Sequence, residues 1–434
     1  MESIEIKPFL SKNNNMLELD IPSSKSLSIR ALILASIASG VSTIKNVLNS
    51  TDTTDCINAL KELGVEIKNN DNDYKIIGCN GILPIKNNKI YFGSSGITSR
   101  FLLAIICASL SKDKSYHEII VDGSEQLRKR TIKPLVDTLN TMGANITYLE
   151  NEGFFPLLIK SVKLNNIENI EVSGALSSQY VSAILMMVPL LDKEVNIYVK
   201  DIKSSEHPYI KMAIQTMKDF GINTINEISE NIYKISPQSY KNTNFYIETD
   251  LNTANYFFAL AGVLNRKIKI KNINKFSLQP GLKFLELLKN MGCEVVFDNN
   301  NVVLNGAKKL KGGFSINMFY MAEMTTLLAV LAVFCDAPIE IHGVKHIRNH
   351  ESDRISAICE ELKKVNIKIE EFDDGLKVYP GNPEYAEVDS HNDHRIAMSL
   401  AILGVVGNGI KIINPTCVSK TCPEFFKLLD IVLK

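Results

Sequence analysis

An apolar stretch with helical spacing, closed by a glycine and followed by a short run rich in valine and isoleucine, recurs along the chain. The closing residues are Gly64, Gly143, Gly221 and Gly292, and Asn366 takes the same place in a fifth copy. Glycine, or asparagine as second choice, suits this place because the residue after a helix commonly adopts a left-handed conformation. The pattern therefore predicts five helices that end at these positions and lead into strands.

The copies follow one another at intervals of roughly 70 to 80 residues, and segment 426–430 resembles the helix of a sixth copy that the chain end cuts short. Each interval has room for several strands and helices. The helix–glycine–strand pattern also occurs singly in many α/β proteins, but five copies at near-equal spacing favour a repeated α/β module.

Composition narrows the class of protein. The chain has 434 residues, of which 45% are hydrophobic and 22% charged, so we expect a globular protein of two or three domains. Lys and Arg (48) balance Asp and Glu (48), which argues against a nucleic-acid or anionic-membrane partner. The N-terminal residues lack the apolar stretch of a signal peptide, and apolar runs such as 396–406 are too short to span a bilayer. The eight cysteines form no C-x-x-C pair, which fits reduced thiols. Together these features lead us to expect a cytoplasmic location.

Three clusters of polar residues precede apolar helices in the first half of the chain. Lys25 and Ser26 open a helix predicted over residues 26–39, Gly93–Arg100 carries two glycines and four hydroxyls, and Ser177–Gln179 precedes an apolar run. Backbone amides at a helix start favour an anion, so each cluster could bind a phosphate or a carboxylate. Each could equally be a solvated helix end with ordinary capping.

Cationic residues dominate two further motifs in the second half. They are Arg348–Arg354 and Asn392–Arg395, and Lys420 follows. Guanidinium groups match carboxylates in a bidentate manner. Glu351 lies in sequence among Arg348, Arg354 and Lys420, and competing neighbours could set its pKa for proton transfer.

Histidines could also form a metal site. His342, His346 and His350 would share one face of a helix and could bind Zn²⁺ there. However, residues 339–341 have the composition of a strand and Gly343 interrupts a helix, so we predict no metal site.

Five motifs resemble, in their order along the chain, those of the 5-enolpyruvylshikimate-3-phosphate synthase family. They are S-K-S-x-S-x-R, S-S-Q, E-S-D-R, N-D-H-R and C-x-x-K-T, between Ser24 and Thr421. The resemblance implies an α/β fold of two similar domains, each of three βαβαββ-like units with helices inside and sheets outside. Domain 1 would comprise residues 1–20 and 250–434, and domain 2 residues 21–249.

The resemblance also implies a reaction. The family transfers the enolpyruvyl group of phosphoenolpyruvate to the 5-hydroxyl of shikimate 3-phosphate and releases phosphate, within the shikimate pathway to aromatic amino acids. The two small molecules are the only partners implied. We therefore expect a monomer that has no metal, no organic cofactor, no nucleic-acid partner and no membrane partner, and whose lobes close over its anionic substrates.

By the same resemblance, individual residues receive roles. Shikimate 3-phosphate is expected to be bound by Lys25, Ser26, Arg30, Ser177, Ser178, Gln179, Tyr209 and Glu323. Phosphoenolpyruvate is expected to be bound by Lys25, Gly96, Arg130, Arg354, Arg395 and Lys420. Glu351 would donate and accept the proton at the methylene carbon with His394 beside it, Glu323 would accept the hydroxyl proton, and Lys25 completes the catalytic set.

Six positions depart from the family pattern, most of them on the acceptor side. Two of them, Ser94 in place of Asn and Ile97 in place of Thr, lie in the Gly93–Arg100 motif. Glu323 stands where the family usually has Asp, His350 where it has Lys, and His346 where it has Asn. Glu206 replaces a Ser, and a carboxylate repels a phosphate dianion. Either Ser205 takes over or the acceptor is not the usual one, and we count Glu206, His346 and His350 among the expected acceptor-binding residues.

Two other functions stay open at this point. The altered acceptor residues would also suit a sister enolpyruvyl transferase with a nucleotide or another cyclic alcohol as acceptor. A non-catalytic anion-binding protein, or a hydrolase that uses the histidines to bind a metal, is the remaining alternative.

Overall fold

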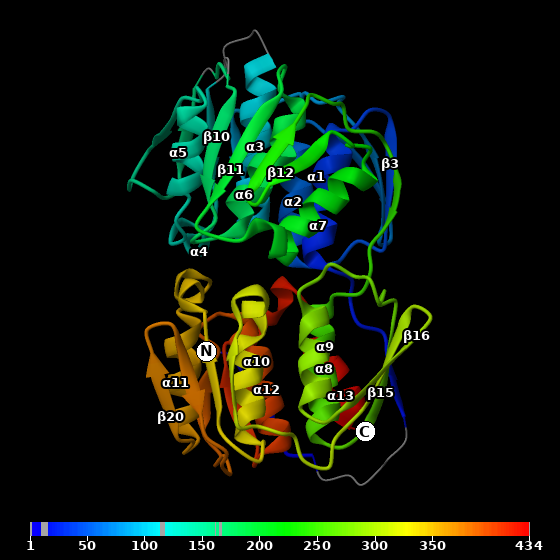
Figure 1. The fold of residues 1–434 in the computed structure, drawn as a ribbon, viewed down its shortest axis with the longest axis vertical. Helices are drawn as coiled ribbons and strands as arrows, with labels where there is room; N and C mark the ends of the chain where they lie inside the picture. The colour runs from blue at the N-terminus through cyan, green and yellow to red at the C-terminus, as the bar shows by residue number, and fades with distance from the viewer. Residues whose placement is uncertain (1, 10–15, 113–117, 161, 165–166, 434) are drawn as a thin grey trace. The chain divides into compact units, whose positions relative to one another are not determined.

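The computed structural model describes residues 2–9, 16–112, 118–160, 162–164 and 167–433. These residues form two compact units (Figure 1). Ser23–Ile247 make up one unit, here called the inserted unit. Met1–Pro22 and Glu248–Lys434 make up the other, here called the discontinuous unit.

The inserted unit contains three sheets with one common plan. In each sheet a parallel pair of strands is extended by an antiparallel hairpin. The first sheet has the order β14 (Asn244–Tyr246), β3 (Val41–Lys45), β5 (Asp73–Ile77), β4 (Glu66–Asn70). The second has the order β6 (Lys89–Tyr91), β7 (Ile119–Asp122), β9 (Leu157–Ile159), β8 (Ile146–Tyr148). The third has the order β10 (Asn169–Ser173), β11 (Val195–Lys200), β13 (Ile232–Ile235), β12 (Ile225–Ser229).

The discontinuous unit repeats this plan, with strands from the N-terminal segment completing two of its sheets. One sheet has the order β16 (Glu294–Asp298), β17 (Asn301–Asn305), β15 (Lys267–Lys271), β2 (Leu17–Leu19). The next has the order β18 (Phe314–Asn317), β19 (Ile339–His342), β21 (Gly375–Val378), β20 (Ile369–Phe372). The last has three strands, β1 (Ser3–Ile6), β23 (Ile410–Ile413) and β22 (Glu387–Asp389), and β1 runs antiparallel to β23.

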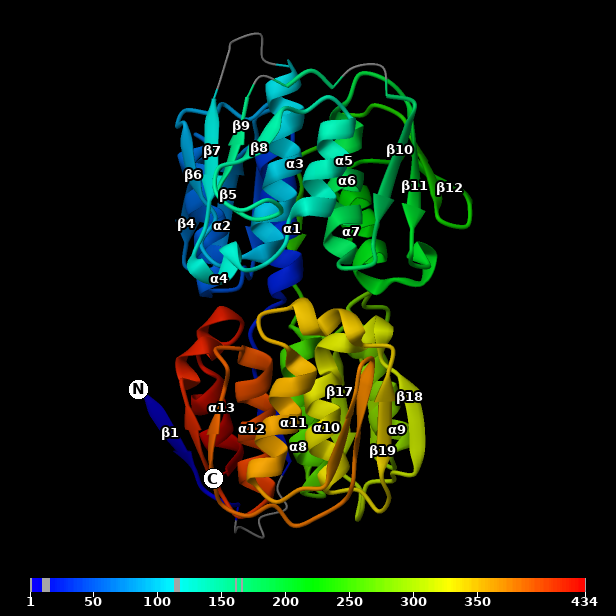
Figure 2. The ribbon, with the colours of Figure 1, turned by 90° about the vertical axis from the view of Figure 1, so that its left-hand side faces the viewer.

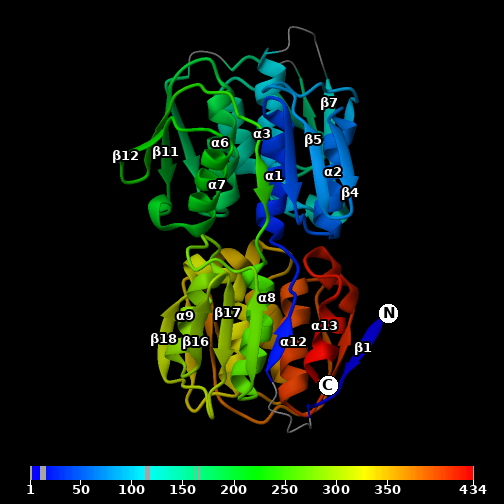
Figure 3. The same ribbon diagram turned by 90° about the vertical axis from the view of Figure 1, so that its right-hand side faces the viewer.

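Six helices form the interior of the two units. They are almost wholly buried, because their sequences are apolar on every side. In Figures 2 and 3 the helices of each unit lie inside its sheets. The buried helices are α1 (Lys25–Ile37), α3 (Gly96–Lys112), α6 (Ser178–Met187), α8 (Leu251–Val263), α10 (Thr325–Val333) and α12 (His394–Val406).

The remaining long helices are amphipathic and pack one apolar face against the interior. They are α2 (Thr51–Glu62), α5 (Lys133–Thr141), α7 (Pro208–Asp219), α9 (Gly281–Asn290), α11 (Arg354–Lys364) and α13 (Phe425–Leu433). The first five are followed by the predicted residue at positive φ, from 63° at Asn366 to 109° at Gly292. The predicted repeat is therefore confirmed, including the short sixth copy, which is α13.

Short helical segments connect these elements. They are α4 (Glu125–Arg128), η1 (Val188–Leu190), η2 (Ser204–Glu206), η3 (Phe319–Met324), η4 (Lys345–Asn349) and η5 (Pro415–Lys420). Within the described part of the chain, every helix is too short or too polar to cross a bilayer.

Two of the polar motifs overlap the helices that follow them. Helix α3 begins at Gly96, so the second half of the Gly93–Arg100 motif is helical. Helix α6 begins at Ser178, inside the Ser177–Gln179 cluster, and ends at Met187. In both cases the buried helix reaches back into the polar motif, which places motif side chains on its first turn.

Candidate active site

The start of α1 brings together the predicted residues Lys25, Ser26 and Arg30. Ser24 caps the helix by accepting a hydrogen bond from the amide of Leu27. The Arg30 guanidinium donates to the carbonyl of Ser26 at 3.0 Å and to that of Tyr209 at 3.4 Å, and it lies 5.0 Å from the centre of the Phe101 ring. Burial lowers the pKa of Arg30 to about 10, so the group keeps its charge at neutral pH.

Lys25 has a counter-ion that sequence reasoning missed. Its ammonium lies 3.1 Å from a carboxylate oxygen of Asp52, in the first turn of α2, and the Asp52 side chain is only 2% exposed. Asp52 lies two residues after Ser50, the N-cap of α2, so a capping pattern was the one signal of its position. The ion pair fixes the direction in which Lys25 points.

Gly96, Arg130 and Gln179 meet around Arg100. A Cβ atom at Gly96 would lie 2.4 Å from Nη1 of Arg100 and 2.6 Å from Nη1 of Arg130, so two guanidinium groups pack directly against this glycine. Arg100 also donates to Oε1 of Gln179 at 3.1 Å. Arg100 was not among the predicted site residues, although its place four residues after Gly96 puts both on one face of α3.

The three consecutive basic residues 128–130 include two arginines with different contacts. Arg128 is bound by Asp122, with Nε to Oδ1 at 2.9 Å, and by Glu150, also at 2.9 Å, so it stabilises the loop. Arg130 is the member that faces Gly96.

The Ser177–Gln179 cluster begins α6. Ser177 is the N-cap and accepts a hydrogen bond from the Gln179 amide at 3.3 Å, as the capping alternative required. Ser178 is buried. Glu206 ends η2 with an exposed side chain, and Tyr209 follows in the first turn of α7.

In the discontinuous unit, Glu323 is surrounded by cationic groups. Its Oε2 accepts from Arg354 at 2.9 Å and from Arg395 at 3.3 Å. Burial alone would favour the neutral acid, but the two guanidinium groups outweigh it and hold the pKa of Glu323 well below its usual range. Glu323 is therefore an ionised carboxylate whose charge two arginines neutralise.

Glu351 forms a second buried cluster with His394 and Lys420. The imidazole Nδ1 of His394 donates to Oε2 of Glu351 at 2.7 Å, and the Lys420 ammonium lies 3.3 Å from Oε1. Against the effect of burial, these two partners hold the pKa of Glu351 well below its usual range. Arg348, three residues before Glu351 in the sequence, pairs with Asp353 at 2.8 Å and with Glu371 at 2.9 Å.

Asp393 links the two clusters and was also missed. It is fully buried, caps α12, and accepts from Nε of Arg354 at 2.7 Å and from the amide of Arg395 at 2.8 Å. The pKa of Arg354 is raised well above its usual range because Asp393 and Glu323 outweigh its burial. The signal was available, since an aspartate before an apolar helix is a strong N-cap candidate.

The histidines do not share a helix face. His342 ends strand β19, Gly343 follows at a φ of 77°, His346 lies in η4, and His350 is the C-cap of η4. The rings of His346 and His350 lie 5.8 Å apart, and burial lowers the pKa of His346. Nδ1 of His350 accepts from Arg354 at 3.1 Å, so its proton lies on Nε2.

Two clusters in the described chain have the composition of metal ligands. Glu351, Asp393 and His394 form one, and Glu360, Glu361 and His391 form the other. In both, protein cations already contact the carboxylates. Lys420 lies against Glu351, Arg354 against Asp393, and Lys364 against both Glu360 and Glu361. The arrangement gives no support for a metal site at either place.

Comparisons with known proteins agree over nearly the whole chain. Residues 13–429 match the family model described as EPSP synthase (3-phosphoshikimate 1-carboxyvinyltransferase). The chain is 38% identical to 3-phosphoshikimate 1-carboxyvinyltransferase 2 of Halalkalibacterium halodurans, covering 99% of this chain and 94% of the relative. It is 34% identical to the 3-phosphoshikimate 1-carboxyvinyltransferase of Nostoc punctiforme, covering 98% of each chain.

Solved structures share the fold. An EPSP synthase from Acinetobacter baumannii superposes with a TM-score of 0.78 at 22% identity, covering 98% of this chain and 97% of that one. The enolpyruvyl transferase NikO from Streptomyces tendae gives a TM-score of 0.76 at 15% identity, covering 99% and 96%. At these identities the likeness concerns the fold alone, which is the predicted two-domain α/β architecture of repeated units.

Proposed function

We propose roles for individual residues from the premise that the chain belongs to the EPSP synthase (3-phosphoshikimate 1-carboxyvinyltransferase) family. The enzyme transfers the enolpyruvyl group of phosphoenolpyruvate to the 5-hydroxyl of shikimate 3-phosphate and releases phosphate, in the shikimate pathway. Both substrates are anions, whereas the chain is formally neutral. The residues that bind them must therefore concentrate positive charge locally.

Phosphoenolpyruvate binding falls to six residues in this proposal: Lys25, Gly96, Arg130, Arg354, Arg395 and Lys420. Two facts about their surroundings support it. The two guanidinium groups against Gly96 leave no room for a side chain there, which keeps the backbone accessible to an anion. Arg354 and Arg395 are held by Asp393 and Glu323, so their orientation is fixed before any ligand arrives.

Glu351 is the proposed acid and base at the methylene carbon. Its charge is balanced by His394 and Lys420. An anionic substrate that draws the Lys420 ammonium away would raise the pKa of Glu351, so that the proton shared with His394 moves onto the carboxylate. Glu351 can then protonate the methylene carbon and take the proton back when phosphate leaves.

Glu323 is the proposed base for the attacking hydroxyl. Arg354 and Arg395 keep it a weak base until a substrate carboxylate competes for the same guanidinium groups. Its oxygen would then accept the hydroxyl proton as the new carbon–oxygen bond forms. Glu323 and Glu351, whose side chains are 24% and 7% exposed, both pair with cations of the phosphoenolpyruvate set, and this pairing is the observation that carries the proposal.

Shikimate 3-phosphate is assigned to Lys25, Ser26, Arg30, Ser177, Ser178, Gln179, Glu206, Tyr209, Glu323, His346 and His350. The Nε2 hydrogen of His350 can donate to a phosphate in place of an ammonium. Unlike an ammonium, this neutral imidazole offers the phosphate a hydrogen bond but no full charge. Replacing His350 by Ala should raise KM for shikimate 3-phosphate more than KM for phosphoenolpyruvate.

A phosphate-release assay with both substrates tests the roles. Glu351→Gln should lower kcat by about 100-fold or more, because the amide cannot exchange a proton. Glu387→Gln, which breaks a surface ion pair with Lys411, is the matched control and should retain full activity. Wild-type kcat in Glu351→Gln would refute its acid–base role.

The same proposal covers the setting of the reaction. We propose that the enzyme works in the cytoplasm as a monomer of 48.4 kDa, which light scattering coupled to gel filtration would measure. Most acceptor-binding residues belong to the inserted unit, and the acid–base residues to the discontinuous unit.

A further inference from the structure

A buried carboxylate of α11 takes no part in the reaction proposed above. Glu361 has no exposed surface. Its Oε1 accepts from Nε2 of His391 at 2.7 Å and from the Lys364 ammonium at 2.9 Å, while its Oε2 accepts from the backbone amide of Asp389 at 3.0 Å. Glu361 thus contacts both ends of the turn Asp389–His391, which leads directly to the N-D-H-R motif.

That turn has an unusual backbone. His391 and Asn392 both have positive φ, 52° and 54°, a conformation that costs energy for residues other than glycine. Side-chain hydrogen bonds hold it, from the His391 amide to Asp389 at 2.8 Å and from the Asn392 amide to Ser390 at 3.2 Å. The turn therefore depends on its contacts, and Glu361 supplies two of them.

Helix α11 also contacts the segment 389–393 at a second point. Arg354, in the first turn of α11, binds Asp393 through two nitrogens at 2.7 and 3.2 Å. Arg354 and Glu361 are seven residues apart, so they lie on one face of the helix about 10 Å apart along its axis. Between them α11 holds the segment 389–393 at both ends, directly before His394 and Arg395.

We propose that Glu361 and His391 are positioning residues for the enolpyruvyl transfer, because they fix the turn from which Asp393, His394 and Arg395 project. The proposal rests on the roles given above to Glu351 and His394. The contact that matters most is the 2.7 Å bond from His394 to Glu351, because proton transfer tolerates little change in distance.

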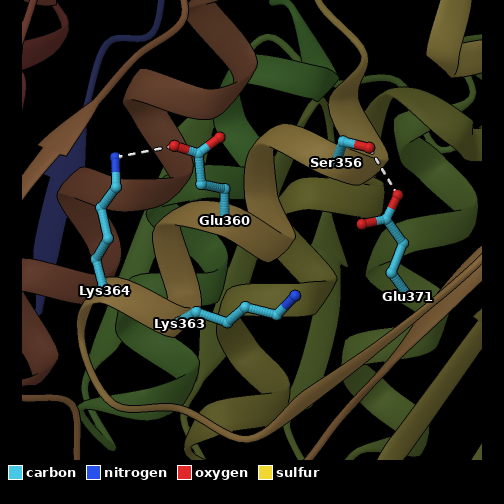
Figure 4. A pocket seen from close by; sticks show the side chains of 5 residues that line it. All are labelled: Ser356, Glu360, Lys363, Lys364 and Glu371. Carbon is cyan, nitrogen blue, oxygen red and sulfur yellow. Dashed lines mark hydrogen bonds and ion pairs between the residues drawn. The ribbon is translucent and has the colours of Figure 1, made fainter.

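The charges around His391 suit an ion pair. Glu361, Glu360 and Lys364 face it from α11, and Asp389 faces it from β22. Lys364 also reaches Glu360 at 3.3 Å, and both residues line a pocket of about 510 Å³ (Figure 4). In the Glu361–His391 pair, Glu361 is the buried partner, and the side toward Lys364 is open to solvent. A change at His391 therefore need not disturb the core.

Three variants test the proposal in the full-length enzyme. His391→Phe keeps a ring but removes the hydrogen bond, and Glu361→Ala removes the carboxylate. Both should lower kcat about tenfold or more, with KM for shikimate 3-phosphate changed less than about threefold. His391→Gln keeps an N–H donor and should stay within about threefold of wild-type kcat.

A pH profile separates positioning from mere stabilisation. If the turn shifts, the His394–Glu351 pair changes, and the limb of the kcat profile that reports this pair should move in His391→Phe by about half a pH unit or more. His342→Phe, an exposed histidine at the end of β19, is the matched control and should change neither kcat nor the profile. Thermal unfolding would confirm that each variant is folded at the assay temperature.

The outcomes distinguish this inference from the assigned reaction roles. Folded His391→Phe and Glu361→Ala with wild-type kcat and an unchanged pH profile would overturn the positioning role, even if Glu351→Gln is inactive. Wild-type kcat in Glu351→Gln would instead refute the acid–base role on which the inference rests.

Discussion

Single atoms limit the space around the residues proposed to bind phosphoenolpyruvate. Gly96 is the clearest case, because a methyl group added there would lie 2.4 and 2.6 Å from two guanidinium nitrogens, well inside contact distance. We expect Gly96→Ala to push Arg100 and Arg130 apart and to raise KM for phosphoenolpyruvate about tenfold or more. Steady-state kinetics with each substrate varied in turn would measure this.

A second glycine provides the control for that substitution. Gly381 is exposed, lies outside the predicted site, and a Cβ there would meet only the flexible end of Ile367. Gly381→Ala should therefore leave both KM values unchanged. An unaltered KM for phosphoenolpyruvate in Gly96→Ala would show that Arg100 and Arg130 can move aside, and that the glycine is not needed for binding.

The pair of Glu361 and His391 predicts a pH dependence of stability. The hydrogen bond between His391 and Glu361 raises the pKa of His391 above 6.5. The protonated imidazole therefore stabilises the fold fully below pH 6.5, and this contribution is lost as the pH rises through the raised pKa. Burial opposes ionisation of Glu361, but His391 and Lys364 outweigh it and lower its pKa below 4.5, so its contribution is present above that pH. Both contributions are complete between these two values.

Urea unfolding of wild type and His391→Phe across pH would measure this effect. The difference in unfolding free energy should be largest between about pH 4.5 and 6.5 and should shrink in alkali. Conversely, a difference that grows with rising pH would mean that the imidazole is held in its neutral form.

At the scale of elements, the five residues that close the amphipathic helices differ in one instructive way. Four are glycines and one is Asn366, at a φ of 63°. Asn adopts the left-handed conformation at a lower energy cost than most residues, including alanine. We expect Asn366→Ala to lower the free energy of unfolding by about 1 kcal/mol and Asn366→Gly to change it by less than about 0.5 kcal/mol.

Chemical denaturation of the two variants would test that expectation. The Asn366 side chain also donates to Glu384 at 2.9 Å on the surface, so Glu384→Ala is the control for the loss of this bond alone. Equal destabilisation by Asn366→Ala and Asn366→Gly would assign the effect to the hydrogen bond rather than to the backbone.

Another element-level feature recurs between the units. Glu62 of α2 accepts from the amide of Tyr91, the last residue of β6, at 3.0 Å. Glu361 of α11 accepts from the amide of Asp389, the last residue of β22, at the same distance. In both units, therefore, an amphipathic helix holds the strand that leads into a buried helix of the candidate site.

The repeat could be predicted because it depends on local signals, namely helix periodicity and the conformational preference of glycine and asparagine. The missed site residues, Asp52, Arg100 and Asp393, depend on contacts with side chains far away in the sequence, such as Asp393 with Arg354. Arg348 likewise has a distant partner, Glu371 of β20, in addition to Asp353 five residues away. Sequence neighbours do not report which charge a folded chain will bring closest.

At the scale of the whole molecule, the first residues of the chain are structural rather than a dispensable tail. β1 pairs with β23 and β2 with β15, and Ile6 and Leu19 are buried in the core of the discontinuous unit. Deleting residues 1–22 would leave two sheet edges unpaired and apolar surface exposed. We expect the truncated chain to unfold at a lower temperature than the full chain.

Differential scanning calorimetry would locate that loss. The inserted unit keeps all strands of its three sheets in the truncated chain, since β14 pairs with β3. Its transition should remain near the wild-type temperature while that of the discontinuous unit falls. A single, unshifted transition would mean that β1 and β2 contribute little.

The pairing of β1 with β23 also orders events during translation. Residues 3–6 leave the ribosome well before their partner strand, residues 410–413, is made. By then the whole of Ser23–Ile247 has emerged and can already have folded, because its sheets are completed within its own stretch of chain. The nascent protein must therefore keep β1 unpaired until the codons for residues 410–413 have been read.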